Sequence, residues 1–269
     1  SEGHRAAREW LLAELRGCGV VVSVAPFVWA GAPAADLANL VATVPASSAG
    51  APIALVGAHY DTVEGSPGAD DDGSGCVVLL ELARRLAGRS FDAEIRLVWF
   101  DAEESGLIGS GSYVQALLPE EAGRVRGMIQ LESIGFVDRS PGTQRLPEGV
   151  RSVFDPGDRG DFLLVLGNLP SRSLAEVVGA ALAEEAGPDF RSEVFAWLPG
   201  AGWVLPDSRR SDHAPFWDAG LAAVLVSDTA DFRNPHYHRA GDTVPTLDLE
   251  FLAAGARGLE RAVVRLASR

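Results

Sequence analysis

The sequence contains no lysine, so all 23 of its basic residues are arginine. They are outnumbered by 37 acidic residues, which leaves a formal net charge of −14. A surface of this sign repels phosphate backbones and anionic lipids, so we expect no nucleic-acid partner. The only two cysteines, Cys18 and Cys76, are too few for a disulfide scaffold and form no CxxC pair. Whether they bond to each other is left open by the sequence.

Long hydrophobic runs are also missing. The uncharged stretches 17–35 and 37–58 are interrupted by glycine, proline and polar residues, whereas a spanning helix needs about 20 mostly apolar residues. We therefore expect no membrane-spanning segment. The chain has 269 residues, 47% hydrophobic and 22% charged, which is typical of a globular protein. Since no linker, repeat or composition break is visible, we predict one domain over residues 1–269.

A pattern of short apolar runs, each followed by polar residues and then a helical segment, recurs along the chain. The apolar runs lie at 53–58, 95–100, 128–131, 162–166 and 221–226. Helices are predicted over about 3–16, 74–87, 173–186 and 247–267, the third opening with Ser173 and Glu176 in capping-box spacing. Near-continuous apolar strands separated by helices indicate a largely parallel sheet covered on both faces.

Residues that can bind metals follow several of these predicted strands. Ligand sites of open α/β sheets collect at the carboxyl ends of the strands. Taken singly, each cluster has an ordinary explanation, such as a strand-end histidine, a helix cap or a solvated helix start. Their joint placement points to a metal site instead. The clusters are His59 with Asp61, the run Asp70–Asp72, Glu103 with Glu104, Glu132, and His236 with His238.

The residue types and spacings suggest roles within such a site. Asp61 is two residues from His59, so in an extended segment it can orient the imidazole ring. Three adjacent acids repel one another unless a cation lies between them. In the pair Glu103–Glu104, one carboxylate can bind a metal while its neighbour serves as a general base. An unpaired charge on Glu132 after an apolar run would be costly without a cation.

The order of the motifs resembles a known family over nearly the whole chain. HYDT, GADDDGSG, FDAEESGLIGS, LESIG, SDHAPF and YHRAGDT are similar to the motifs of dizinc aminopeptidases of the bacterial leucyl aminopeptidase and aminopeptidase Y type. The resemblance implies a three-layer α/β fold with a mixed, mostly parallel twisted sheet of about eight strands flanked by helices, as in zinc exopeptidases. It also favours an extracytoplasmic or secreted location.

The resemblance assigns roles position by position. It implies two Zn²⁺ ions, with the native metal left open, and hydrolysis of peptides that have a free N-terminus through a zinc-bridging water. Asp71 would bridge the two ions and Glu103 would be the general base. Glu132 stands where the family more often has aspartate. The remaining roles are His59 and Glu132 as ligands of the first zinc, Glu104 and His238 as ligands of the second, Asp61 as the residue orienting His59, and Tyr237 as a hydrogen-bond donor to the oxyanion.

Two other functions fit parts of this pattern. A glutaminyl cyclase-like enzyme shares much of the site but uses one zinc for an intramolecular transfer. A non-enzymatic binding domain on a peptidase scaffold is disfavoured because every ligand and the base are present. We expect His213, in SDHAPF, to be structural, and the long loop 135–160 after Glu132 to cover or shape the substrate pocket.

Overall fold

One mixed sheet forms the centre of the molecule. The structure is a computed structural model that describes residues 1–31, 36–117, 120–187 and 189–268. Its eight strands lie in the order β1-β2-β4-β3-β5-β8-β6-β7. Their bounds are β1 (Val21–Phe27), β2 (Leu37–Val44), β3 (Ile53–His59), β4 (Glu94–Phe100), β5 (Val125–Glu132), β6 (Phe162–Asn168), β7 (Arg191–Leu198) and β8 (Ala223–Ser227).

The middle of the sheet is parallel and its flanks contain antiparallel pairs. β3 pairs in parallel with β4 and β5, and β5 with β8. β1–β2, β2–β4 and β6–β8 are antiparallel, while the edge pair β6–β7 is again parallel. Every residue of β3 is buried, as expected for a parallel strand covered on both faces. The predicted mixed, mostly parallel sheet of about eight strands is therefore confirmed.

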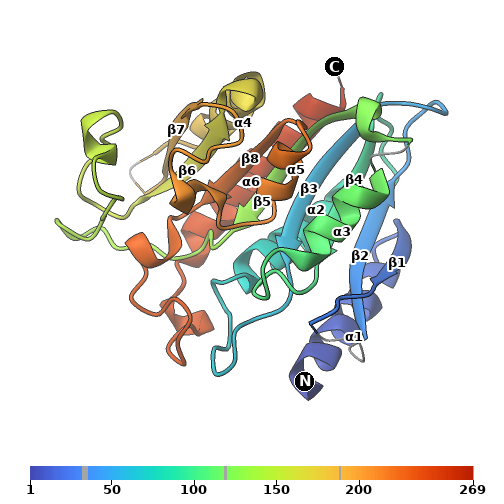
Figure 1. Cartoon of the computed structure of the whole chain (residues 1–269), viewed down its shortest axis with the longest axis horizontal. Coiled ribbons are helices and arrows are strands. Elements are labelled where there is room, and N and C mark those ends of the chain that lie inside the picture. Colours follow the sequence, from blue (N-terminus) through green and yellow to red (C-terminus); the bar gives the residue numbers. More distant parts are fainter. Residues whose placement is uncertain (32–35, 118–119, 188, 269) are drawn as a thin grey trace.

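Helices cover both faces of the sheet (Figure 1). α1, α2, α4 and α6 contribute to one apolar cluster, whereas α3 and α5 contribute to the other, on the opposite face. Short 3-10 helices lie in the connections. The helices are α1 (Glu2–Arg16), α2 (Gly73–Leu86), α3 (Ile108–Leu117), α4 (Arg172–Ala183), α5 (Ala214–Asp218) and α6 (Leu249–Ala267), and the 3-10 helices are η1 (Ala122–Arg124), η2 (Val150–Ser152), η3 (Leu169–Ser171), η4 (Pro206–Arg209), η5 (Ala230–Phe232) and η6 (Val244–Thr246).

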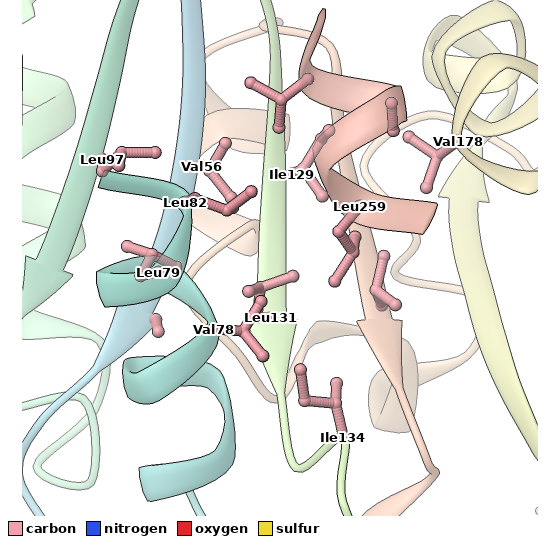
Figure 2. Close-up of a cluster of buried hydrophobic side chains, with 14 of the residues drawn as sticks. Val56, Val78, Leu79, Leu82, Leu97, Ile129, Leu131, Ile134, Val178 and Leu259 are labelled. Carbon is pink, nitrogen blue, oxygen red and sulfur yellow. The ribbon is translucent and has the colours of Figure 1, made fainter. Parts of the chain in front are cut away.

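The larger apolar cluster holds the strands that end in the candidate site. Figure 2 shows Ile129 and Leu131 of β5 between α2 and α6, facing Leu82 and Leu259. All four side chains are at most 1% exposed. Full burial of such a side chain contributes roughly 1.5–3 kcal/mol. This packing fixes the strand ends, and with them the residues that follow β3 and β5.

The start of α4 differs from the prediction. The helix begins at Arg172, so Ser173 lies inside it and is not its N-cap. Asn168 caps the preceding 3-10 helix η3 through the backbone N–H of Ser171, and the chain is therefore already helical before Ser173. Glu176 instead pairs with Arg172, at 2.9 Å.

Both cysteines are free thiols: Cys76 is buried and Cys18 is partly buried. Among the described residues, no helix is both long enough and apolar enough to cross a membrane.

Candidate dinuclear metal site

Loops at the carboxyl ends of the parallel strands meet at one edge of the sheet, on its lower side in the view of Figure 1. β3 ends at His59, β4 leads into Asp101–Glu104, and β5 ends at Glu132. The segment 234–242 joins them from the C-terminal part of the chain. Parallel pairing places these strand ends in register, with His59 beside Phe100 and Glu132 beside Ser227.

The first candidate metal position is formed by His59, Asp71 and Glu132, which are all buried. Nε2 of His59 lies 3.1 Å from Oδ1 of Asp71 and 3.4 Å from Oε1 of Glu132. One atom from each residue lies within 4.8 Å of the others. These three residues will be called the first triad.

The second candidate position shares Asp71 with the first. Nε2 of His238 lies 3.0 Å from Oδ2 of Asp71 and 3.1 Å from Oε2 of Glu104. Asp71, Glu104 and His238 form the second triad, again with ligand atoms within 4.8 Å. Each oxygen of Asp71 thus faces a different triad. The structure brings together all five residues predicted to bind metal.

The two triads fit a pair of zinc ions chemically. Each offers one imidazole nitrogen and two carboxylate groups, a donor set that zinc accepts, and three protein ligands leave a position open as in catalytic sites. Oε1 of Glu104 is a buried oxygen with no hydrogen-bond donor among the described residues. Oδ2 of Asp71 is close to His238 without the directionality of a hydrogen bond. Buried polar atoms without partners are uncommon, and a cation would satisfy both.

The electrostatic potential at the triads is strongly negative. Burial lowers the pKa of His59, but Glu132 and Glu103 more than offset this and raise the pKa well above its ordinary value. Burial, reinforced by Asp71, raises the pKa of Glu104 to about 7. Burial opposes ionisation of Asp71, yet the rings of His238 and His59 outweigh it and lower the pKa of that carboxyl. Carboxylates held this close are stabilised together by cations.

Asp61 lies next to the first triad and contacts the ring of His59 through its backbone. Nδ1 of His59 contacts the backbone carbonyl oxygen of Asp61 at 3.0 Å, while the carboxylate lies 3.7 Å away. The carboxylate accepts hydrogen bonds from the backbone N–H groups of Glu103 and Glu104, at 3.0 and 3.2 Å. The orienting role of Asp61 on the ring stays a prediction, and the hydrogen-bond contact at Nδ1 comes from its backbone oxygen.

Glu103 lies beside the triads and belongs to neither. Its side chain is 7% exposed. Burial raises the pKa of Glu103 well above its usual value, and the charges of Glu132, Asp212 and Glu104 add to the effect. A carboxylate next to a metal position, with a raised affinity for protons, has the properties of a general base.

The histidines and the tyrosine near the C-terminus occupy different environments. Tyr237 stacks on His238, with ring centroids 3.9 Å apart, and its hydroxyl accepts a long hydrogen bond of 3.4 Å from Arg210. His236 is outside both triads and packs edge-on against Phe136. The segment 234–242 forms successive turns rather than an extended strand, and only His238 of the two histidines belongs to a triad.

His213 has a structural position. It is buried, and its Nε2 donates to the carbonyl oxygen of Ser208 at 2.8 Å while the ring packs edge-on against Trp217. Burial lowers the pKa of His213 to about 4, so the ring is neutral at neutral pH. Two residues earlier, Ser211 donates to Oε2 of Glu132 at 2.6 Å. This bond leaves Oε1 of Glu132 facing His59.

An apolar cavity of about 100 Å³ adjoins the first triad. Its polar lining includes Glu132, Asp207, Arg210, Asp231 and Tyr237. Four residues of loop 135–160 line it as well, and the role of this loop in a substrate pocket stays a prediction. The apolar lining consists of Leu146, Pro147, Val150, Phe154, Leu164, Leu166, Phe195, Leu205, Leu225 and Phe232.

Comparison with known proteins agrees with this geometry. Residues 39–159 match Peptidase family M28. This part of the chain is similar to an M28 peptidase domain. The match includes four of the five triad residues, and His238 lies beyond it.

Two curated relatives and one solved structure resemble the chain over most of its length. It is 34% identical to the uncharacterised protein YfbL of Escherichia coli (strain K12) over 77% of this chain and 65% of that protein. It is 48% identical to aminopeptidase YwaD of Bacillus subtilis (strain 168) over 74% of this chain and 38% of that protein. A zinc aminopeptidase from Bacillus subtilis superposes with a TM-score of 0.66 and 27% identity, over 86% of this chain and 50% of that one. The chain thus spans less than two thirds of the length of these proteins.

Some residues that shape the site were not predicted from the sequence. Asp72 accepts hydrogen bonds from the backbone N–H groups of His59, Gly75 and Ser133, so it caps α2 and joins the ends of β3 and β5. Asp242 accepts from the backbone N–H groups of Asp70 and Asp71, at 2.9 and 3.2 Å. Both aspartates lie inside the motifs GADDDGSG and YHRAGDT. Their partners are backbone N–H groups, which every residue except proline has, so the sequence contains no pattern that would indicate these bonds.

Proposed function

We propose that residues 1–269 form the catalytic domain of a zinc aminopeptidase that removes N-terminal residues from peptides. The observation that carries the proposal is the pair of triads that share Asp71, with Glu103 beside them and outside both. A single catalytic zinc uses three protein ligands, so five ligand residues with one shared correspond to two ions. The names of the relatives support the same activity.

Each part of the site has a task in peptide hydrolysis. Zinc ions in the two triads would supply Lewis acidity for the scissile carbonyl and make a nearby water more acidic. Glu103 accepts the proton of the attacking water and passes it to the leaving amine. Tyr237, which stacks on His238, would donate a hydrogen bond to the carbonyl oxygen as negative charge develops there. Ser211 holds the free oxygen of Glu132 in place.

Acidic side chains around the triads also favour a positively charged group of the substrate. An α-amine has an unperturbed pKa of about 7.7–8.0 and is largely protonated at neutral pH. Glu103 and Glu132 are both buried carboxyl groups beside the metal positions. Attraction between these acids and the amine would place the first peptide bond at the site.

We expect acetylation of the N-terminal amine to abolish cleavage of an otherwise good peptide. The acetyl group removes the positive charge that Glu103 and Glu132 would bind. The same peptide, free and acetylated, is incubated with zinc-loaded protein and the products are followed by mass spectrometry. Protein treated with a chelator is the control and should release nothing until Zn²⁺ is restored.

The same assay separates the alternatives. Internal cleavage of the acetylated peptide would make the protein an endopeptidase. Formation of pyroglutamate from a peptide that begins with glutamine, with one zinc per chain, would assign it to the cyclases. Unchanged cleavage by verified metal-free protein would refute a metallopeptidase.

The apolar cavity predicts which N-terminal residue is preferred. Its volume of about 100 Å³ suits an aliphatic side chain of leucine size. Since one methylene in an apolar pocket changes specificity about 10–200-fold, we expect kcat/KM for leucyl substrates to exceed that for glycyl substrates by at least ~10-fold. Phe154→Ala should enlarge the cavity and shift preference towards phenylalanine. Val153→Ala, next to it but 74% exposed, should change nothing. A preference for glutamyl or arginyl substrates would contradict this assignment.

A further inference from the structure

The loops that follow β3 and β4 hold each other through two carboxylates, the half-buried Asp61 and the buried Asp101. Asp61, on the first loop, accepts hydrogen bonds from the backbone N–H groups of Glu103 and Glu104 on the second, at 3.0 and 3.2 Å. Asp101, at the start of the second loop, accepts a hydrogen bond from the hydroxyl of Tyr60 on the first at 2.7 Å. The bonds to the two carboxylates run in opposite directions between the loops. The position of either loop therefore depends on the other.

Asp101 joins this pair of loops to the N-terminal helix. Its side chain is 1% exposed. Oδ2 of Asp101 accepts hydrogen bonds from the backbone N–H of Ala38, at 2.9 Å, and from the hydroxyl of Tyr60. Oδ1 lies 2.7 Å from Nε2 of His4. Because an ionised carboxylate only accepts, Nε2 is the protonated ring nitrogen of His4. Burial opposes ionisation of Asp101, but His4 and Tyr60 outweigh it and lower its pKa.

His4 contacts Tyr60 directly as well. The two rings are stacked, with centroids 5.2 Å apart and planes inclined by 17°. Tyr60 directly follows His59 in the sequence. Contacts that hold the ring and the hydroxyl of Tyr60 therefore act on the neighbour of a triad member. His4 thus touches both members of the Asp101–Tyr60 pair.

The rest of the first half of α1 is held less closely. A cleft of about 780 Å³ lies between this helix and the loops, with Trp10, Val77 and Pro67 among its walls. α1 buries Leu11 and Leu15, both in its second half. Arg8, one turn after His4, pairs with Asp36, whose side chain is 72% exposed. His4 is therefore placed to act on the site through direct contacts, whereas the hydrogen bonds of Arg8 go to Asp36 and not to Asp101 or Tyr60.

We propose that His4 is a positioning residue of the metal site, acting through Asp101 and Tyr60 on the loops that carry His59, Glu103 and Glu104. The inference rests on the proposed function in one respect, that the triads bind zinc. Removing the imidazole leaves Oδ1 of Asp101 without this donor and the ring of Tyr60 without its stacking partner. Partners outside the ligand shell commonly change metal affinity 10–100-fold. His4 is further from the ion than such partners, so we expect the lower end of that range.

The test compares His4→Ala with His4→Gln and Arg8→Ala in the full chain. Zinc affinity is measured with Zn²⁺ alone, in competition with a chromophoric chelator. We expect His4→Ala to raise the dissociation constant about tenfold. His4→Gln, which keeps an N–H donor, should recover part of the loss. Arg8→Ala removes an ion pair from the same helix and should leave zinc affinity unchanged.

A second readout needs no zinc. In the metal-free protein, hydrogen exchange reports how well the backbone N–H groups of Glu103 and Glu104 are protected. Both groups donate hydrogen bonds to Asp61. They should exchange faster in His4→Ala than in wild type and Arg8→Ala. Tyr60→Phe removes the hydroxyl but keeps the ring, so it provides a second variant if His4→Ala does not fold. It should also weaken zinc binding, and less than additively with His4→Ala because both act on Asp101.

Two results would overturn the proposal. One is unchanged zinc affinity and unchanged exchange in His4→Ala, and the other is equal changes in His4→Ala and Arg8→Ala, which would mean that both act only through helix docking. Failure of the proposed function looks different. If the wild-type protein binds zinc but cleaves no peptide, the zinc affinities of the variants still test the role of His4. If the wild-type protein binds no zinc, the hydrogen-exchange rates still test it.

Discussion

Replacing Glu103 with glutamine is expected to lower kcat by at least ~10²-fold while both zinc ions stay bound. Glu103 belongs to neither triad, so the substitution leaves every proposed ligand intact. Glutamine is close in size to glutamate but cannot accept the proton of the attacking water. Turnover is measured with a leucyl peptide, and metal content by elemental analysis of the same preparation.

The control for this variant is Glu64→Gln, an exposed position on the loop after β3. It changes the same functional group at a distance from the triads and should leave kcat and zinc content at wild-type values. Near-normal turnover of zinc-replete Glu103→Gln would assign the base to another group. Loss of zinc together with turnover would instead make Glu103 a ligand.

The parts of the fold that could be predicted are those with a strong local signal. Apolar runs such as 53–58 and 95–100 became β3 and β4 because strands buried on both faces need a continuous apolar sequence. β7 was not predicted, because this edge strand is buried only near its end and contains charged residues at Arg191 and Glu193. α5 spans only Ala214–Asp218, which is too short for a periodic pattern. The strand order, and which pairs are antiparallel, depend on tertiary packing and came only from the structure.

The candidate site was predicted better than the fold, for a physical reason. Parallel strands bring their carboxyl ends to one edge, so His59, Glu104 and Glu132 could be expected to meet. His238 was placed by its motif, since nothing local indicates where a turn-rich segment returns. For Asp61, the spacing indicated a position beside His59, but it did not indicate that the carboxylate accepts hydrogen bonds from backbone N–H groups of another loop. Long-range partners of this kind leave no pattern in one sequence.

The bridging role of Asp71 predicts a difference between single-ligand variants. We expect Asp71→Ala to lose both zinc ions and all measurable activity, and His238→Ala to keep the ion of the first triad. Asp71 contributes one oxygen to each triad, so without it the first keeps only His59 and Glu132, and the second only Glu104 and His238. Two ligands are fewer than the three that catalytic zinc sites use. His238→Ala leaves the buried first triad complete.

Zinc content after dialysis against buffer of known free Zn²⁺, measured by elemental analysis, decides between these outcomes. His236→Ala is the matched control for His238→Ala, because it removes a ring two residues away that packs against Phe136 and belongs to neither triad. It should keep both ions. If Asp71→Ala retained one tightly held ion, the remaining two ligands of one triad would suffice and Asp71 would not bridge. If His238→Ala lost both ions, the triads would depend on each other through more than the shared carboxylate. Zinc content is therefore expected to be equal in wild type and His236→Ala, lower in His238→Ala and lowest in Asp71→Ala. This order is the one expected if the Asp71 carboxylate is shared between the two triads.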